Sequence, residues 1–144
     1  MTKGVDHIGI AVVYFCHDGK GKLLMHKRSQ AARDEHGCWD VGGGAVEFGH
    51  SAGQTLKKEI LEEYNTKILA FEFLGYRDDV FRQYQGRPTH WVTLDFKVLV
   101  DPKLVKNNEP HKFEELGWFT LNALPSPLHS QLPLFLKKYQ DKLA

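Results

Sequence analysis

One stretch near the middle of the chain, Gly42 to Thr66, restricts the possible folds more than any other. It opens with three consecutive glycines ending at Gly44, which suit a tight turn or a close approach of the backbone to a ligand. Ser51 is a favourable helix N-cap, and a helical pattern continues to about Tyr64. Apolar residues recur along it at i, i+4 spacing: Ala52, Leu56, Ile60 and Tyr64. We therefore predict a helix that packs one apolar stripe against a core, directly after a glycine segment.

The same helix carries three glutamates on an adjoining face. Glu59, Glu62 and Glu63 stand at i, i+3, i+4 spacing, so that their like charges lie on neighbouring turns. Two interpretations are open. The charges can be ordinary solvated surface, balanced by Lys57 and Lys58, or they can bind a hard divalent cation, which prefers carboxylate oxygens and substrate phosphates.

The register between the glycines and the glutamates favours the metal site. The segment resembles the Nudix box, G-x5-E-x7-R-E-U-x-E-E-x-G-U, in which U is aliphatic. Gly44 matches the first glycine, Glu59 the glutamate after the arginine, and Ile60 the aliphatic position. Glu62 and Glu63 match the paired glutamates.

Four positions depart from this pattern. His50 stands where the family has its first glutamate, Lys58 replaces the arginine, Asn65 the second glycine and Thr66 the last aliphatic residue. Asn is the next best residue to Gly in a left-handed C-cap, so we expect Asn65 to end the helix. Lys58 lacks the planar fork of arginine, and a histidine is a poor Mg²⁺ ligand. We expect the metal site to be retained, and whether these two changes lower the activity is an open question.

The resemblance implies hydrolysis of a nucleoside diphosphate linked to another group, X. A pyrophosphate carries dense negative charge, which Mg²⁺ (or Mn²⁺) held by Glu59, Glu62, Glu63 and a backbone carbonyl near Gly43 would neutralise. One carboxylate must also accept a proton from the attacking water, and both Glu63 and Glu59 are candidates for this base. The leading substrate class is (deoxy)nucleoside triphosphates, including oxidised ones. Substrates of the ADP-ribose, nucleotide-sugar or coenzyme A type, or a catalytically weakened nucleotide-binding domain, are alternatives.

A second set of residues is predicted to contact the substrate. Arg28 and Arg33 precede the glycines, where guanidinium groups could bind phosphate, although exposed solubilising charge is an equal interpretation. Tyr84 could stack on a base, as could Phe48 or Trp39, but aromatic residues more often pack in a core.

An acid from the loop before the last strand could also join the site, as this loop does in several branches of the Nudix family. The chain offers Glu109, Glu114 and Glu115 there, and solvated loop charge is the alternative for each.

The order of predicted elements indicates an α+β fold, with a mixed sheet and helices on its faces, and the resemblance implies an α-β-α sandwich. A second helix is expected near Ser130–Leu143, and a polar loop over Asp78–Thr89. In His90–Val100 the even-numbered side chains, from Val92 to Val98, are expected to form the core face. The predicted strands are His7–Phe15, Leu23–Lys27, Trp39–Val41, Lys67–Arg77, His90–Val100 and Leu116–Thr120.

The 144 residues fit one domain, residues 1–144, and a net charge of +1 gives no reason to invoke a nucleic acid polymer as partner. No apolar run approaches the roughly 20 residues of a membrane span, and the N-terminus lacks the apolar core of a signal peptide. Cys16 and Cys38 lack metal-site spacing and are expected to be reduced, buried thiols, consistent with a cytoplasmic protein. A homodimer is a possibility that only the family resemblance implies.

Overall fold

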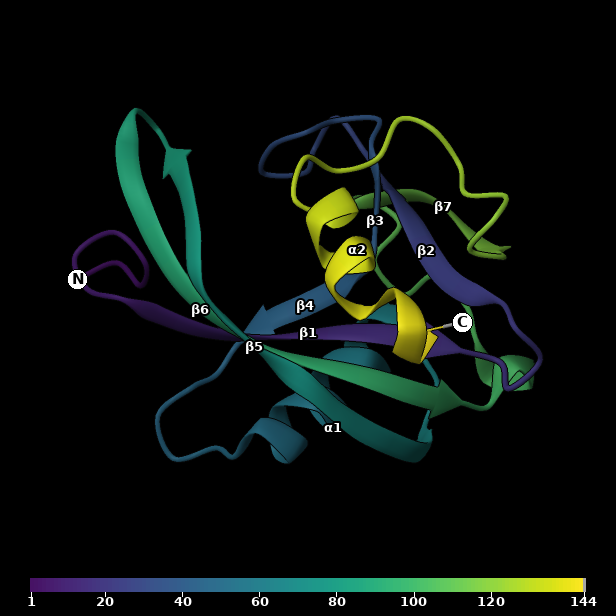
Figure 1. The fold of residues 1–144 in the computed structure, drawn as a ribbon. Coiled ribbons are helices and arrows are strands. Elements are labelled where there is room, and N and C mark those ends of the chain that lie inside the picture. The colour runs from purple at the N-terminus through teal and green to yellow at the C-terminus, as the bar shows by residue number, and fades with distance from the viewer. Residues whose placement is uncertain (144) are drawn as a thin grey trace.

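The computed structural model describes residues 1–143, which contain a seven-stranded mixed sheet and two α-helices. Five strands follow one another in the order β3-β2-β1-β6-β5, while β4 pairs with β1 and β7 with β2 (Figure 1). β1 and β6 are parallel, and the other pairs are antiparallel. The elements are β1 (Gly9–His17), β2 (Leu23–Arg28), β3 (Trp39–Asp40), β4 (Gly42–Ala45), α1 (Ala52–Tyr64), β5 (Ile68–Tyr84), β6 (Arg87–Val100), η1 (Pro102–Leu104), β7 (Phe113–Phe119) and α2 (Leu132–Leu143).

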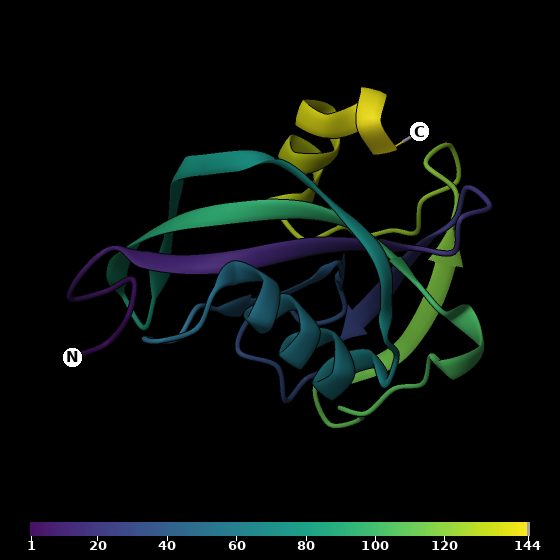
Figure 2. The ribbon, with the colours of Figure 1, turned by 90° about the horizontal axis from the view of Figure 1, so that it is seen from below.

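The two helices lie on opposite faces of the sheet (Figure 2), which confirms the predicted α+β sandwich. One core, which includes Tyr14, Leu56 and Val98, fills the space between α1 and the sheet. The other, which includes Phe15 and Phe135, lies between α2 and the sheet. In the part of the chain that the structure describes, no helix is long and apolar enough to cross a membrane.

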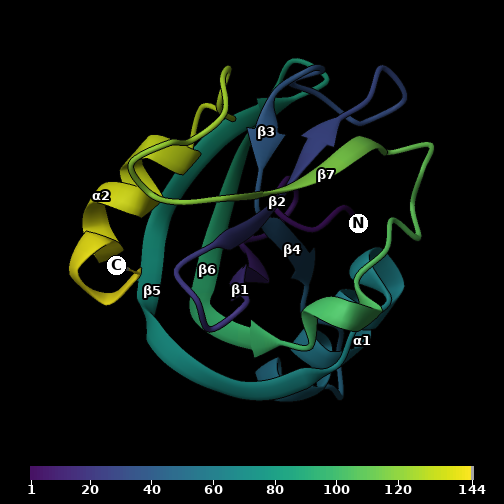
Figure 3. The same cartoon turned by 90° about the vertical axis from the view of Figure 1, so that its right-hand side faces the viewer.

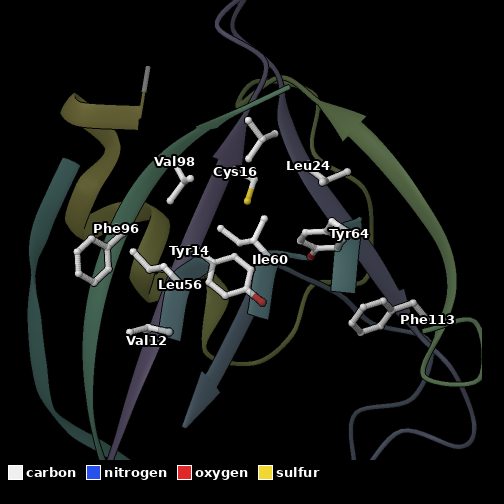
Figure 4. Close-up of a cluster of buried hydrophobic side chains, with 11 residues drawn as sticks. Val12, Tyr14, Cys16, Leu24, Leu56, Ile60, Tyr64, Phe96, Val98 and Phe113 are labelled. Atoms are coloured by element: carbon white, nitrogen blue, oxygen red, sulfur yellow. The ribbon is translucent and has the colours of Figure 1, made fainter. Parts of the chain in front are cut away.

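Helix α1 begins and ends where its sequence predicts. The Ser51 hydroxyl accepts a hydrogen bond from the Gln54 amide, and the Gln54 side chain accepts one from the Ser51 amide, forming a capping box. Asn65 adopts the left-handed conformation with φ of 56°, and its amide donates to the Leu61 carbonyl. Of the predicted stripe, Ala52 is half-buried, while the other three side chains are buried in the core (Figure 4): Leu56, Ile60 and Tyr64.

The prediction of a loop over Asp78–Thr89 is wrong, because β5 and β6 continue through this segment as a long antiparallel arm. Figure 1 shows this arm extending away from the rest of the sheet. Gln85 and Gly86 form its two-residue turn, with φ of 51° and 77°, the positive values that a type I′ hairpin requires. The polar residues are accommodated because the arm is largely exposed, and the pairing is irregular between Arg77 and Val80.

Strand β6 is buried on both faces rather than on one. Phe96 and Val98 lie in the core beneath α1, as predicted, but Thr93 and Asp95 on the other face are also buried. Asp95 is stabilised there because the Arg77 guanidinium donates two hydrogen bonds to it, at 2.7 and 2.8 Å. The charge of Asp95 is therefore paired beneath helix α2, on the face of β6 that sequence alternation alone predicts to be exposed to solvent.

Candidate functional site

The glycine segment is a strand and not the predicted turn. β4 runs antiparallel to β1, with Gly44 opposite Val12 and Gly43 opposite Val13. The reason for glycine is close approach, not unusual backbone angles, since no positive φ occurs in this strand. A Cβ atom on Gly44 would lie 2.5 Å from the carboxyl carbon of Glu59. The predicted close approach of the backbone thus occurs, and it brings β4 against the acidic flank of α1.

Glu59 and Glu62 differ in their exposure. The Glu59 carboxylate is half-buried against Gly44, whereas Glu62 is exposed. Burial raises the pKa of Glu59, and the negative charges of Glu62 and Glu47 raise it further, while Lys58 and Lys112 oppose the shift. This flank of α1 therefore concentrates negative charge next to exposed glycine backbone.

Glu63 is the most unusual of the three carboxylates. Its Oε1 atom is enclosed and has no hydrogen-bond partner among the described residues. Burial raises the pKa of Glu63 to about 8, with Lys112 lowering it and Glu109 raising it. A buried carboxylate oxygen normally has a partner. An orphaned carboxylate oxygen one helical turn from Glu59 fits a site for a divalent cation that takes oxygen ligands.

Of the three predicted loop acids, one lies near this group. The loop before β7 is tied to α1 because the Asn108 amide donates to the Glu63 carbonyl at 3.1 Å. Glu109 follows directly and acts on the pKa of Glu63. Glu114 instead pairs with Lys27 at 3.5 Å, and Glu115 is exposed on β7.

A cavity of about 420 Å³ begins at Glu63 and the glycine strand. This volume is within the usual range of small-ligand sites. The cavity extends from the acidic flank to the arm, so a ligand could contact both. Its lining includes Val41, Gly42, Gly43, Gly44, Glu63, Val80, Arg82, Thr93 and Phe135.

The predicted phosphate-binding arginines both line this cavity. Arg28 is already engaged, since its guanidinium donates to the Asp34 carboxylate at 2.9 Å. The Arg33 guanidinium lies over the Tyr84 ring, 3.7 Å from its centroid, which places these two predicted residues together. Among the stacking alternatives, Trp39 is buried in the core and Phe48 is exposed on the loop before α1.

Sequence reasoning missed a polar cluster on the cavity wall. Arg82 donates to Asp34 at 2.9 Å and to Glu35, and His129 Nε2 lies 2.8 Å from Glu35. Burial raises the pKa of Asp40, beside this cluster, to about 7. Arg82 falls within the segment predicted to be a loop, so the sequence analysis did not place it in the site. The one available signal was that Asp40 lies two residues before the first glycine, Gly42.

The two basic residues at substituted box positions, His50 and Lys58, both lie near the carboxylate of Glu47. Lys58 Nζ lies 3.6 Å from a carboxylate oxygen of Glu47, and His50 Nδ1 lies 3.9 Å from the other. A carboxylate thus faces the basic residue of the helix although position 50 holds a histidine. The remaining departure is also accommodated, because the buried Thr66 hydroxyl donates to the Asp101 carbonyl at 2.7 Å.

Solved structures of similar fold come from several organisms. A MutT NUDIX hydrolase from Burkholderia pseudomallei is 26% identical, with a TM-score of 0.78, over 92% of this chain and 98% of that one. The NUDIX domain of Shewanella oneidensis NrtR, complexed with ADP ribose, is 18% identical with a TM-score of 0.71, over 96% and 90%. A bifunctional NMN adenylyltransferase/ADP ribose pyrophosphatase from Francisella tularensis, complexed with AMP and a Mn ion, is 16% identical with a TM-score of 0.68. This match covers 96% of this chain and 42% of that one.

The family model described as the NUDIX domain matches residues 7–139, which include every element from β1 to β7 and most of α2. The match therefore extends far beyond the box that carries the sequence resemblance. With the box glutamates beside the glycine strand and the sandwich around them, the chain belongs to the NUDIX domain family and is a Nudix-type hydrolase of pyrophosphate bonds.

Proposed function

We propose that this hydrolase depends on a divalent cation and cleaves a pyrophosphate bond in a nucleoside diphosphate linked to X. The observation that carries the proposal is the enclosed Oε1 of Glu63, a cavity-lining residue, which has no hydrogen-bond partner among residues 1–143. An uncompensated buried carboxylate destabilises a fold, and a bound cation is the ordinary reason for keeping one.

The ligands that we propose are Glu59, Glu62, Glu63 and the backbone carbonyl of Gly43. The chemistry of this donor set, three carboxylates and a carbonyl, fits Mg²⁺ and also Mn²⁺. When bound, such an ion would neutralise phosphate charge and lower the pKa of its bound water.

The chain's own residues would orient the substrate and accept a proton. Arg33 lines the cavity, and its guanidinium is held over the Tyr84 ring, where its N–H groups would donate to a phosphate. Arg28 is held by Asp34, so its contribution is a fixed positive charge on the same wall. A carboxylate oxygen of Glu63 or Glu59 would take the proton of the attacking water.

The leading substrates are (deoxy)nucleoside triphosphates, including oxidised ones. The cavity lining includes apolar side chains, Val80 and Phe135, and the hydroxyl of Thr93, which has no hydrogen-bond partner among the described residues. An apolar site with a few polar groups suits a base, while the arginines suit the phosphates. ADP-ribose is the main competitor, because a relative of similar fold binds it.

The test is product release from a panel of nucleotides and ADP-ribose with Mg²⁺, comparing the native chain with Glu63→Gln. We expect a loss of about 10²–10³-fold in kcat for the variant, since one essential carboxylate is removed. Glu115→Gln, which changes an exposed carboxylate outside the site, is the matched control and should retain activity. Equal turnover by the native chain and Glu63→Gln would refute the proposal.

The second candidate is a catalytically weak nucleotide-binding domain, and the substitutions at His50 and Lys58 favour it. Calorimetric binding of a nucleotide with no turnover of any substrate would support this alternative.

We further propose that residues 1–144 act as one domain, because both cores pack on a single sheet. The free thiols of Cys16 and Cys38 support a cytoplasmic protein.

A further inference from the structure

Glu35, in the loop between β2 and β3 (residues 29–38), binds donors from two other segments of the chain. Its Oε1 accepts a hydrogen bond from the Ser130 amide at 2.7 Å, and its Oε2 accepts one from the Ser130 hydroxyl at 2.9 Å. The same Oε2 accepts from the Arg82 guanidinium and lies 2.8 Å from His129 Nε2. One carboxylate therefore joins its own loop to the arm and to the segment before α2.

The ring of His129 is a neutral donor to Glu35. Its Nδ1 accepts a hydrogen bond from the Gln131 amide at 3.2 Å, so the proton of the neutral ring is on Nε2, the atom that faces Glu35. Burial lowers the pKa of His129 to about 4, although the charge of Glu35 opposes this shift. The neutral ring is therefore the form present near neutral pH, and Arg82 is the charged partner of Glu35.

The backbone of Glu35 is also unusual. Its φ is 47°, in the left-handed region that residues with a side chain seldom adopt. A glycine would adopt this conformation without that cost. Conformations of this kind persist where the surrounding contacts determine them, and they are concentrated at ligand-binding sites. The contacts of the carboxylate, and not the turn of the chain, therefore account for a glutamate here.

The residues that Glu35 contacts line the cavity, although Glu35 itself does not. Arg82 of the arm and His129 are both part of the lining. Asp34, the neighbour of Glu35, also lines the cavity and accepts a hydrogen bond from Arg82 at 2.9 Å. Figure 3 shows the loop after β2, the end of the arm and the segment before α2 at the same end of the molecule. Glu35 thus lies behind the cavity wall and contacts groups that would face a ligand.

A second contact joins the same loop to the same arm. The Arg33 guanidinium lies over the Tyr84 ring, 3.7 Å from its centroid. Arg33 is two residues before Glu35 in the loop, and Tyr84 is two residues after Arg82 in the arm. The ion pair between Glu35 and Arg82 is therefore next to this contact and holds together the two segments that make it. Because Arg33 is an exposed residue, its long side chain would otherwise lose more conformational freedom on binding a ligand.

We propose that Glu35 is a positioning residue for substrate binding, which holds the loop against the arm so that Arg33 is preorganised to bind a substrate phosphate. The inference rests on the proposed function, in which Arg33 contacts a phosphate, and adds a residue outside the cavity on which that contact depends. The carboxylates that would hold the metal lie on α1, in another part of the chain. Loss of Glu35 should therefore weaken substrate binding and leave the chemical step unchanged.

Glu35→Gln tests the proposal, because it keeps the size of the side chain and removes its charge. A glutamine has one acceptor oxygen, so it cannot serve Ser130 on one side together with Arg82 and His129 on the other. We expect the KM for dGTP or ADP-ribose with Mg²⁺ to rise about 5–20-fold, while kcat stays within about twofold.

A binding measurement separates this inference from the proposed function. The calorimetric Kd of the α,β-methylene analogue of dGTP should rise by the same factor in Glu35→Gln, and it needs no turnover. If the native chain binds the analogue and hydrolyses nothing, the proposed function fails, and a higher Kd in Glu35→Gln still supports the positioning role.

Asp6→Asn is the matched control, because it breaks another ion pair of the arm. Arg87 Nη2 donates to Asp6 Oδ1 at 2.9 Å, and neither of these two residues lines the cavity. This variant should keep the native KM and the native Kd. Hydrogen exchange should likewise become faster over residues 29–38 and 80–86 in Glu35→Gln and stay native over residues 29–38 in Asp6→Asn.

A double-mutant cycle with Arg33→Ala shows whether Glu35 acts through Arg33. If it does, adding Glu35→Gln to Arg33→Ala should raise the KM no further. A purely structural role would instead lower thermal stability and leave the KM unchanged. An unchanged KM in Glu35→Gln, or the same rise in the Arg33→Ala background as in the native chain, would overturn the proposal.

Discussion

Two buried carboxylates on opposite faces of the sheet are treated in opposite ways. Asp95, beneath α2, accepts two hydrogen bonds from Arg77 and a third from the Tyr139 hydroxyl. Glu63, beside β4, has an enclosed oxygen with no partner among residues 1–143. Both sites enclose a carboxyl group, yet only Asp95 receives hydrogen bonds from within the chain, whereas Lys112 acts on Glu63 through its charge.

The difference separates a structural acid from a functional one. A buried charge is tolerated when its partner is part of the fold, and then its removal harms stability. A buried acid whose partner is a bound ligand destabilises the fold while that ligand is absent. Removing such an acid harms function instead of stability. The predictions below test this contrast by changing each acid or its surroundings.

The largest effect is expected at Asp95. Asp95→Ala leaves the Arg77 guanidinium buried without its carboxylate, which typically costs about 3–5 kcal/mol. Urea unfolding should therefore show a strongly lowered free energy of unfolding. Asp79→Ala, at an exposed acid of the neighbouring strand, should change it by less than about 0.5 kcal/mol. A loss below about 1 kcal/mol at Asp95 would mean that the pair is not structural.

The second effect concerns the geometry of the acidic flank. Gly44→Ala places a methyl group 2.5 Å from the carboxyl carbon of Glu59, and the half-buried side chain can move away. We expect Mg²⁺ affinity, measured from the metal dependence of activity, to fall about 10–100-fold while the free energy of unfolding changes little. Gly53→Ala within α1, where a Cβ meets only Ser51 Oγ at 4.0 Å, should leave the affinity unchanged. An unchanged affinity in Gly44→Ala would remove Glu59 from the proposed ligands.

The third effect is the part of the pH dependence of stability that Glu63 produces, beside the part that Asp40 produces. The pKa of Glu63 is raised from 4.5 to about 8, so the folded metal-free chain binds this proton more tightly than the unfolded chain. The contribution of Glu63 to stability is therefore complete below about pH 4.5 and is lost as the pH rises towards 8. Glu63→Gln should remove that loss, so that its free energy of unfolding exceeds that of the native chain by on the order of 2 kcal/mol above neutral pH.

Thermal unfolding in a chelator, compared between the native chain and Glu63→Gln at each pH, measures this difference. Taking the difference cancels the other titrating groups, and Glu115→Gln is again the control. Saturating Mg²⁺ should stabilise the native chain more at higher pH, because the ion binds the ionised carboxylate. Identical pH profiles for the native chain and Glu63→Gln would show that Glu63 is not a strained acid.

The parts of the fold that depend on local sequence were predictable. Ser51, Asn65 and the buried stripe fix the limits and the orientation of α1 through interactions within a few residues. The arm was not predictable in this way, because its charged residues, Asp78 and Asp79, are typical of loops. Pairing between β5 and β6 and the type I′ turn determine its structure, and the pairing depends on contacts between distant residues.

The sequence predicts a set of candidate site residues, but it does not predict how the structure arranges them. The spacing of Glu59 and Glu63 predicts a shared helix flank, and the structure has it facing the glycine strand. Sequence could not show that Arg28 is held by Asp34, or that Asp95 on the supposedly exposed face of β6 is buried. Each of these depends on a partner at a position that no local pattern specifies.

The smallest predicted effect concerns the carboxylate that faces the altered box positions. Glu47 lies 3.6 Å from Lys58 and 3.9 Å from His50, and all three side chains are more than 40% exposed, at 54%, 43% and 43%. Exposed pairs contribute about 0.2–1 kcal/mol, so Glu47→Gln should lower kcat/KM about two- to fivefold, and less at high salt. Glu72→Gln on β5, far along the chain from this loop, is a charge-matched control.

The same reasoning predicts the outcome of restoring the box. Because Glu47 already supplies a carboxylate to the basic residue of α1, the double variant His50→Glu/Lys58→Arg should gain at most a few-fold in kcat/KM. In the Glu47→Gln background the same double change should more than recover the loss, since the new glutamate at position 50 takes over the pairing with position 58. A large gain in the native background would instead mean that Glu47 does not compensate and that the two substitutions limit this hydrolase. Steady-state kinetics on the four proteins, at one Mg²⁺ concentration and two salt concentrations, separates these outcomes as a double-mutant cycle.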